Sequence, residues 1–216
     1  MKKIAVILSG CGVFDGAEIH EAVLTLLNIE LQGASYQCFA PNIDQHHVIN
    51  HITGEEMPEK RNVLVESARI ARGEIKDLKE LNISEFDALA LPGGFGAAKN
   101  LCDFALKGAE CEINEDVANA CRAFADAQKP AAYICIAPAI IPQVYAAGTL
   151  ATIGNDLDTA NVVNALGAAH HNCAVDDIII DESAKVISTP AYMLATNIRE
   201  AASGIEKAIA QLVKMS

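Results

Sequence analysis

Short apolar runs alternate along the chain with segments in which apolar residues recur at helical spacing. The run 4–8 (Ile-Ala-Val-Ile-Leu) is apolar at every position, as in a strand that is buried on both faces of a sheet. Residues 19–31 follow with apolar side chains three and four positions apart, and Gly33 stands where a helix would end. The start of the chain therefore predicts a strand followed by a helix.

The same alternation continues to the C-terminus. The pattern predicts strands at 35–40, 88–91 and 131–134, a hairpin at 178–180 and 186–188, and helices at 63–71, 117–127, 139–147 and 193–213. Strands that alternate with helices across short Gly/Pro junctions are typical of an α/β fold with a mostly parallel sheet. No linker or low-complexity stretch interrupts the pattern, so we expect a single domain over residues 1–216.

Composition narrows the choice of partners. The chain has 16 basic and 28 acidic residues, a formal net charge of −12. This charge argues against nucleic acid or an anionic membrane as a partner. No apolar run reaches the roughly 18 residues of a membrane-spanning helix, and the N-terminal run is too short for a secretory signal.

The seven cysteines include no CxxC pair, and their number is odd. They do not form the pattern of a disulfide framework. Together with the missing signal sequence, they predict a reduced, cytoplasmic protein with at least one free thiol.

Parallel sheets bind ligands beyond the carboxyl ends of their strands, so the strand-to-helix junctions are the candidate sites. Cys135 directly follows the strand 131–134, and Pro138 fits the first turn of the next helix. A cysteine at such a turn is lifted out of the sheet edge, and the helix N-terminus and the next backbone N–H favour negative charge there. The alternative is a buried cysteine that packs as a small hydrophobic residue.

A second junction, Leu91-Pro92-Gly93-Gly94, closes the strand 88–91. Paired glycines allow the backbone to approach a ligand closely, and their N–H groups are candidates for one half of an oxyanion hole. The alternative is a plain tight turn. The stretch lacks the Gly-Lys-Ser/Thr ending of a phosphate-binding P-loop.

The junction after the first strand, residues 9–16 (SGCGVFDG), loosely resembles a dinucleotide-binding loop. Asp15, Glu18 and Glu21 crowd this turn and would repel a pyrophosphate, so we expect no nucleotide cofactor. These acids either complement the dipole of the first helix or place one carboxyl in the cleft toward Cys135.

The LPGG junction, the cysteine at a strand end and the acid on the first helix together resemble the ThiJ/PfpI group of the class I glutamine amidotransferase-like superfamily. More narrowly, SGCGVFDGAEIHEAV, LPGGFGAAKNL, CIAPA and TPAYMLA resemble the ElbB subfamily, whose members are described as glyoxalases or as proteins that enhance lycopene biosynthesis. The resemblance runs from Lys3 to about Lys207. It implies a flavodoxin-like three-layer sandwich with a nucleophile elbow at Cys135.

The resemblance also assigns roles within the site. An acid on the first helix would hydrogen-bond the thiol, and gapless alignment places it at Glu21, with Glu18 as the alternative. The backbone N–H groups of Gly94 and Ile136, with Gly93 beside them, would bind an oxyanion. Such an environment would hold the thiol pKa below its free value of ~8.5.

The implied activity is that of a cofactor-free glyoxalase. The Cys135 thiol would add to glyoxal or methylglyoxal, and a hemithioacetal would lead to glycolate or lactate. Ile136 stands where PfpI-like proteases have a histidine, which argues against protease or glutaminase activity. The alternative is a non-catalytic protein that binds a small molecule, or senses aldehydes or oxidants, in connection with isoprenoid metabolism. Relatives usually dimerise, so a homodimer is expected.

Three further residues are candidates for the cleft: Cys11, Asn100 and Asp156. The TIGNDLDTA stretch that contains Asp156 could instead cap the next helix through Asp158.

A metal site would have to come from one of two histidine-containing clusters. These clusters are His46, His47 and His51, and His170, His171 and Cys173. The segment HHVINHIT is rich in β-branched residues and favours strand or loop over the helix that a metal-binding pair would need, so we expect no metal.

Overall fold

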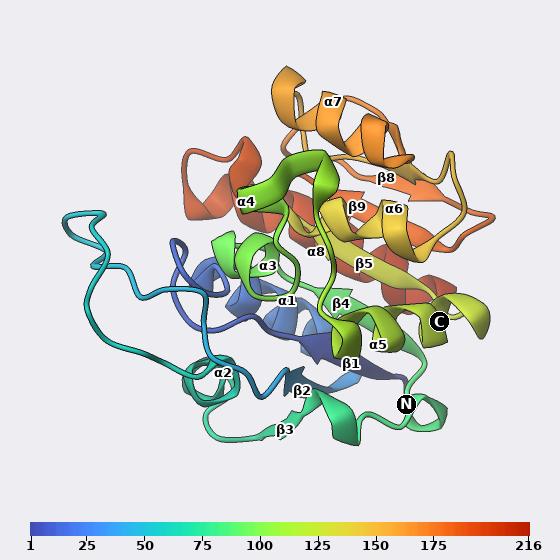
Figure 1. Cartoon of the computed structure of the whole chain (residues 1–216). Helices are drawn as coiled ribbons and strands as arrows, with labels where there is room; N and C mark the ends of the chain where they lie inside the picture. Colours follow the sequence, from blue (N-terminus) through green and yellow to red (C-terminus); the bar gives the residue numbers. More distant parts are fainter.

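The computed structural model describes residues 1–216 and centres on a seven-stranded sheet (Figure 1). The strand order is β3-β2-β1-β4-β5-β9-β8, and every neighbouring pair is parallel except β8 with β9. The strands are β1 (Lys3–Ile7), β2 (Ser35–Ala40), β3 (Ile75–Asp77), β4 (Ala88–Leu91), β5 (Ala131–Ile134), β8 (Ile179–Asp181) and β9 (Val186–Thr189). A separate parallel pair joins β6 (Leu150–Ala151) to β7 (Ala169–His170).

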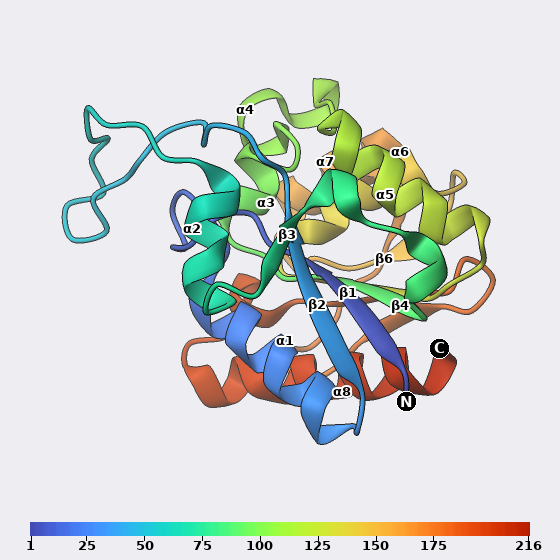
Figure 2. The ribbon, with the colours of Figure 1, turned by 90° about the horizontal axis from the view of Figure 1, so that it is seen from below.

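Helices cover both faces of the sheet, as Figure 2 shows. On one face α1 (Ile19–Leu31) and α8 (Ile198–Met215) lie side by side, and α5 (Glu115–Asp126) packs on the other. The other helices are α2 (Val63–Ile70), α3 (Phe95–Lys99), α4 (Phe104–Lys107), α6 (Ile141–Val144) and α7 (Leu157–Leu166), with 3₁₀ turns η1 (Leu78–Glu80), η2 (Ile83–Glu85), η3 (Gly108–Glu110), η4 (Ala137–Ile140) and η5 (Ala191–Met193). The flavodoxin-like three-layer fold is confirmed.

The first strand shows why its apolar run is continuous. Ile4 and Val6 pack in the cluster that includes α1 and α8, whereas Ala5 and Ile7 pack in the cluster that includes α5. All four side chains are buried. A strand covered on both faces has no solvent-facing position, so the alternation of polar residues disappears.

The predicted helix 139–147 is wrong. The chain forms two shorter turns there, η4 and α6, and α6 ends before Tyr145. Pro138 and Pro142 each stand in the first turn of one of them. Proline lacks a backbone N–H and is tolerated at a helix start, so the second proline begins a new turn and does not continue the first helix.

Two other helix starts differ from the prediction. The C-terminal helix begins at Ile198 and not at 193, because Asn197 caps it by accepting a 3.0 Å hydrogen bond from the N–H of Glu200. The cap of α7 is Asp156 and not Asp158, since its Oδ1 accepts the N–H of Thr159 at 2.8 Å.

A long segment between β2 and α2 leaves the body of the molecule and returns to it, as Figures 1 and 2 show. It carries His46, His47 and His51. None of the helices combines the length and the apolar character that crossing a bilayer requires.

Candidate active site

Cys135 lies immediately after the carboxyl end of β5, which runs between β4 and β9 in the sheet. Its backbone has φ 64°, in the left-handed region that residues other than glycine rarely adopt. Its N–H donates to the carbonyl of Thr189 in the neighbouring strand at 2.9 Å, which holds the turn in place. A strand, a sharp turn with a strained cysteine and a following helical turn are the geometry of a nucleophile elbow.

Two backbone N–H groups converge on the sulfur of Cys135. One belongs to Gly94, which follows β4, and the other to Ile136, which follows β5. The two strands are neighbours in the sheet, so their junctions meet at one edge. Negative charge that develops beside Cys135 would therefore have two donors, as an oxyanion hole requires.

The paired glycines are more than a tight turn. A β-carbon at Gly93 would lie within 3.0 Å of both the Cβ of Cys135 and the Oε2 of Glu21. A β-carbon at Gly94, whose φ is 93°, would strike the backbone of Gly16 and Glu18. Only glycine lets the loop after β4 approach the cysteine and α1 this closely.

Glu21 is the acid that contacts Cys135. Its side chain is fully buried on α1 and hydrogen-bonds the thiol. Its two oxygens also accept backbone N–H bonds, Oε2 from Gly93 at 3.0 Å and Oε1 from Tyr192 at 3.1 Å. Three segments far apart in sequence thus fix the position of one carboxyl.

The pKa values of both members of this pair are raised. Burial raises the pKa of Glu21 to about 8, although the N–H of Tyr192 opposes the shift. Burial, and next the charge of Glu21, raise the pKa of the Cys135 thiol well above its ordinary value. The predicted lowering of the thiol pKa is therefore wrong. The free energy lost when a thiolate is removed from water exceeds the free energy gained from the two N–H donors.

Glu18 has a different role from that of Glu21. Its Oε2 accepts the N–H of Glu21 at 2.6 Å, so it is the N-cap of α1. The same residue lines the cavity next to Cys135. Its acid group supports the helix that carries Glu21 and does not replace Glu21 beside the sulfur.

A cavity of about 510 Å³ adjoins the sulfur. Most of its lining is apolar, and includes Val13, Phe95, Ala98, Phe104, Ile136 and Met193. Its polar side chains are those of Glu18, Asp156, Thr159 and Tyr192. Asp156 therefore lines this cavity, and it also caps α7.

Cys11 and Asn100 are not part of this cavity. Cys11 lies near the charges of Glu66 and Arg69 on α2, and burial raises the pKa of its thiol. The Nδ2 of Asn100 donates to the carbonyls of Ser9 and Asp15, each at 2.9 Å.

The Oδ1 of Asn100 in addition accepts the N–H of His46 at 2.9 Å. Asn100 therefore ties the loop after β1 and the segment after β2 to the end of α3. Both cleft assignments are wrong, because sequence proximity to the sheet edge does not fix which side of the loop a side chain takes.

Sequence reasoning missed Tyr192. It follows β9, its N–H binds Glu21, and its ring borders the cavity, where its hydroxyl lies 2.8 Å from Nδ1 of His20. The only sequence signal was the TPAYMLA stretch, which supported the family resemblance without a role. Its importance follows from the pairing of β5 with β9.

Three histidines of the two candidate metal clusters contact groups outside those clusters. Nε2 of His47 lies 3.1 Å from the ammonium of Lys99, and Nε2 of His51 accepts the N–H of Phe14 at 3.2 Å. His170 accepts the N–H of Ile153. No three or more His, Cys, Asp or Glu side chains are grouped as they would be to hold a metal ion.

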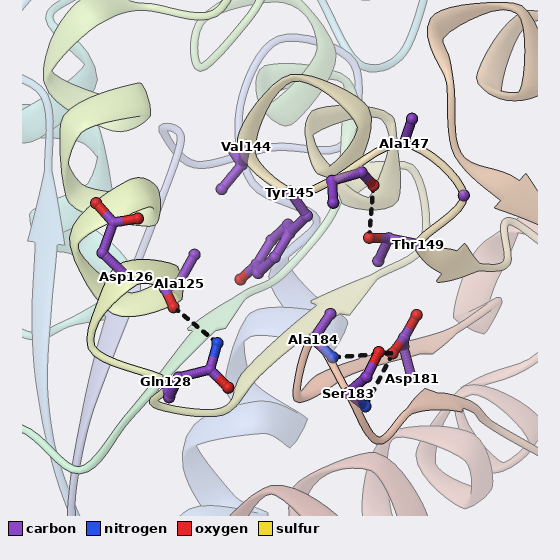
Figure 3. Close-up of a pocket in the computed structure, with 12 residues that line it drawn as sticks. Ala125, Asp126, Gln128, Val144, Tyr145, Ala147, Thr149, Asp181, Ser183 and Ala184 are labelled. Carbon is purple, nitrogen blue, oxygen red and sulfur yellow. Dashed lines mark hydrogen bonds between the residues drawn. The ribbon is translucent and has the colours of Figure 1, made fainter.

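A second cavity, of about 360 Å³, lies near the end of α5 and the β8–β9 turn (Figure 3). Two acids, Asp126 and Asp181, line it. Asp181 has a structural role, since its Oδ1 accepts the N–H groups of Ser183 and Ala184 and its Oδ2 accepts that of Leu150. This cavity lies toward the amino end of β9, away from the edge where ligands of parallel sheets bind.

Comparison with known proteins agrees with the fold. The chain is 41% identical over 224 residues to the ES1 protein homolog, mitochondrial, of Rattus norvegicus, covering 99% of this chain and 84% of the relative. It is also 41% identical over 224 residues to glutamine amidotransferase-like class 1 domain-containing protein 3, mitochondrial, of Homo sapiens. That match covers 99% of this chain and 83% of the relative. No protein-family model matches the chain.

Among solved structures, the isoprenoid biosynthesis protein with an amidotransferase-like domain from Ehrlichia chaffeensis superposes with a TM-score of 0.92. It is 36% identical and the match covers 100% of this chain and 99% of that one. Drosophila melanogaster DJ-1beta, at 15% identity and a TM-score of 0.53, shares the fold, with coverage of 100% and 98%.

The chain thus has the fold of an amidotransferase-like domain, and it shares this fold with ThiJ/PfpI and DJ-1 proteins. Within that class, the chain belongs to the ES1 family of glutamine amidotransferase-like class 1 proteins. The resemblance seen in the sequence is confirmed.

The relatives contradict the predicted cytoplasmic location. The curated proteins from rat, human and zebrafish that match this chain are all named as mitochondrial. The prediction rested on the unpaired cysteines and on the missing secretory signal. Both are features of a protein kept in a reducing environment, and they do not identify one particular compartment.

Proposed function

We propose that this protein is a cofactor-free, cysteine-dependent glyoxalase that acts on small α-oxoaldehydes. The observation that carries the proposal is the contact of Cys135 with Glu21 at a cavity wall that also presents the N–H groups of Gly94 and Ile136. A nucleophile, a proton carrier and two oxyanion donors are the groups that the reaction needs.

The first step joins the sulfur to the substrate. In the reactive form the Glu21 carboxylate accepts the thiol proton while Sγ of Cys135 adds to the aldehyde carbon. The carbonyl oxygen takes the electron pair as an oxyanion beside the N–H groups of Gly94 and Ile136. Return of the proton to that oxygen gives a hemithioacetal, and no oxidant or reductant is consumed.

The next steps move hydrogen between the two substrate carbons. Glu21 removes the C–H proton of the hemithioacetal while the second carbonyl oxygen takes a proton from water, and an enediol forms. Glu21 then gives its proton to the second carbon while the hydroxyl on the sulfur-bearing carbon returns its proton to the hydroxide, which leaves a 2-hydroxy thioester on Cys135. Water adds to the thioester carbon, the C–S bond breaks, and the thiol is restored. Glyoxal plus water becomes glycolate and a proton.

The test is the consumption of glyoxal and methylglyoxal by the purified protein. We expect Cys135→Ala to abolish it and Glu21→Gln to lower kcat at least a hundredfold, because catalysis by a positioned acid–base contributes about 10²–10⁴-fold. Below pH 8 the rate should rise with pH, since Glu21 must be ionised to accept the thiol proton. Full turnover by Cys135→Ala would disprove the proposal.

A second candidate function rests on the pKa of Cys135. A thiol whose pKa is raised is a weak nucleophile at neutral pH, and this favours a protein that binds a small molecule in the cavity without converting it. Binding of a small molecule in the cavity without formation of a product would support this function. The expected homodimer is tested separately by sedimentation of the purified chain.

A further inference from the structure

The cavity beside Cys135 is larger than the substrates named above require. Its volume of about 510 Å³ falls within the range of about 300–1,000 Å³ that holds drug-sized ligands. Glyoxal and methylglyoxal have two and three carbons, and would leave most of the apolar lining exposed to water. Cys135 and Gly94 are buried, whereas Phe95 and Asp156 are exposed, so the reacting group would lie deep and a substituent would extend toward solvent.

The charges around the cavity have one sign. Two acids, Glu18 and Asp156, line it, and no lysine, arginine or histidine does. The hydrogen bond from Thr159 lowers the pKa of Asp156, so its charge is present at neutral pH. Lys99 is outside the lining, with its ammonium 4.7 Å from the ring centre of Phe95 and 3.1 Å from His47.

These two features select the substrate by its substituent. An apolar group gains about 25 cal/mol for each Å² of surface that it buries against Phe104, Ile136 and Met193. A carboxylate or phosphate in the same place would lose water, meet two acids and find no cation. The apolar lining therefore favours neutral apolar compounds, and the two acids disfavour anionic ones.

We propose that the site takes α-oxoaldehydes of the form R–CO–CHO in which R is an uncharged apolar group of aromatic size. The inference rests on the proposed function for its chemistry, while the selection by size and charge depends only on the cavity. Such a compound passes through the same hemithioacetal, enediol and thioester, and the product is the 2-hydroxy acid R–CHOH–COO⁻.

The kinetic test compares three compounds: methylglyoxal, phenylglyoxal and 4-carboxyphenylglyoxal. We expect kcat/KM for phenylglyoxal to exceed that for methylglyoxal at least tenfold, since burial of an aromatic ring is worth about 1.5–3 kcal/mol. The carboxylated compound should be at least tenfold poorer than phenylglyoxal. Equal or reversed preferences would overturn the inference while leaving the glyoxalase proposal intact.

Two variants localise the effect. Ala105 is exposed on α4 and lines the cavity, so Ala105→Trp should lower the phenylglyoxal-to-methylglyoxal ratio at least fivefold. Ala109→Trp, an exposed alanine outside the lining, is its matched control and should leave the ratio unchanged. Asp156→Asn keeps a helix cap and removes the charge, so it should improve the relative rate of the carboxylated compound about threefold.

A second readout does not need turnover. Acetophenone and 4-acetylbenzoate are unreactive analogues, and each is tested for protection of Cys135 from iodoacetamide, measured by mass spectrometry. Protection by acetophenone, with none by 4-acetylbenzoate or acetone at equal concentration, supports the selection even if no aldehyde is consumed. Equal protection by all three, or none by acetophenone, overturns it.

Discussion

Gly93 lies directly against Cys135, so close that a β-carbon at Gly93 would overlap the Cβ of the cysteine. The N–H of Gly93 binds Glu21 and its carbonyl accepts the N–H of Glu18 at 3.0 Å. One residue without a side chain thus joins the end of β4 to the start of α1 and leaves room for the contact between sulfur and carboxyl.

Gly93→Ala is expected to separate Cys135 from Glu21 and to destabilise the fold. Overpacking of a buried position costs about 1–3 kcal/mol. Urea unfolding measures the loss, and a rise in the alkylation rate of Cys135 reports the opened contact. Gly33→Ala is the control: its φ is 71° but a β-carbon there meets nothing within 4 Å, so only the left-handed backbone cost of about 1–2 kcal/mol applies. Wild-type stability and reactivity in Gly93→Ala would contradict the packing described.

Glu21 should make the stability of the protein fall as pH rises. Its pKa is about 8 when folded and 4.5 ordinarily, so between these values the folded state holds a proton that the unfolded state has lost. Stability then declines with pH by at most about 1.4 kcal/mol per pH unit in this window. Unfolding free energies from pH 5 to 8 should show a steeper decline in the wild type than in Glu21→Gln. Parallel curves would show that Glu21 ionises normally.

The Cys135 thiol should react slowly at neutral pH. Because burial and the neighbouring carboxyl raise its pKa, the rate of alkylation by iodoacetamide, resolved for each cysteine by mass spectrometry, should keep rising beyond pH 8.5. At pH 9, Glu21→Gln should accelerate the reaction several-fold, since no carboxylate then opposes the thiolate. Glu206→Gln, an exposed acid on α8, is the matched control. A rate that reaches its plateau below pH 8 in the wild type would contradict a raised pKa of the Cys135 thiol.

Asn100→Ala should destabilise the fold without touching the cavity. The substitution leaves the carbonyls of Ser9 and Asp15 and the N–H of His46 without their partner, and each unsatisfied buried group costs about 1–3 kcal/mol. We expect a loss of about 2–4 kcal/mol in chemical unfolding, allowing for partial access of water. Asn119→Ala, at an exposed position of α5, should stay within about 0.5 kcal/mol of the wild type.

Much of the fold follows from local pattern. The strands at 35–40, 88–91 and 131–134 have the predicted bounds. The last two are short apolar runs, as in buried parallel strands, and Pro41 and Pro92 follow the first two. The small elements were missed: β3, α3 and α4 have three to five residues each, too few to show a period. Whether such a short segment forms a helix or a strand depends on the elements that pack against it. The start of α3 is an example, since a β-carbon at Gly94 would strike the backbone of Gly16 and Glu18, just before α1.

The sequence by itself determined where the reactive groups stand. A cysteine after β5, paired glycines after β4 and an acid on α1 must meet at one edge of a parallel sheet, since all three follow the carboxyl ends of adjacent strands. Only the tertiary structure decided that Glu21 and not Glu18 contacts the sulfur, that Tyr192 holds Glu21, and that the pKa of the thiol is raised. The physical reason is burial. Water is excluded from the contact between Glu21 and Cys135 by segments as far apart in the sequence as 171 residues, and a local sequence pattern does not predict that exclusion.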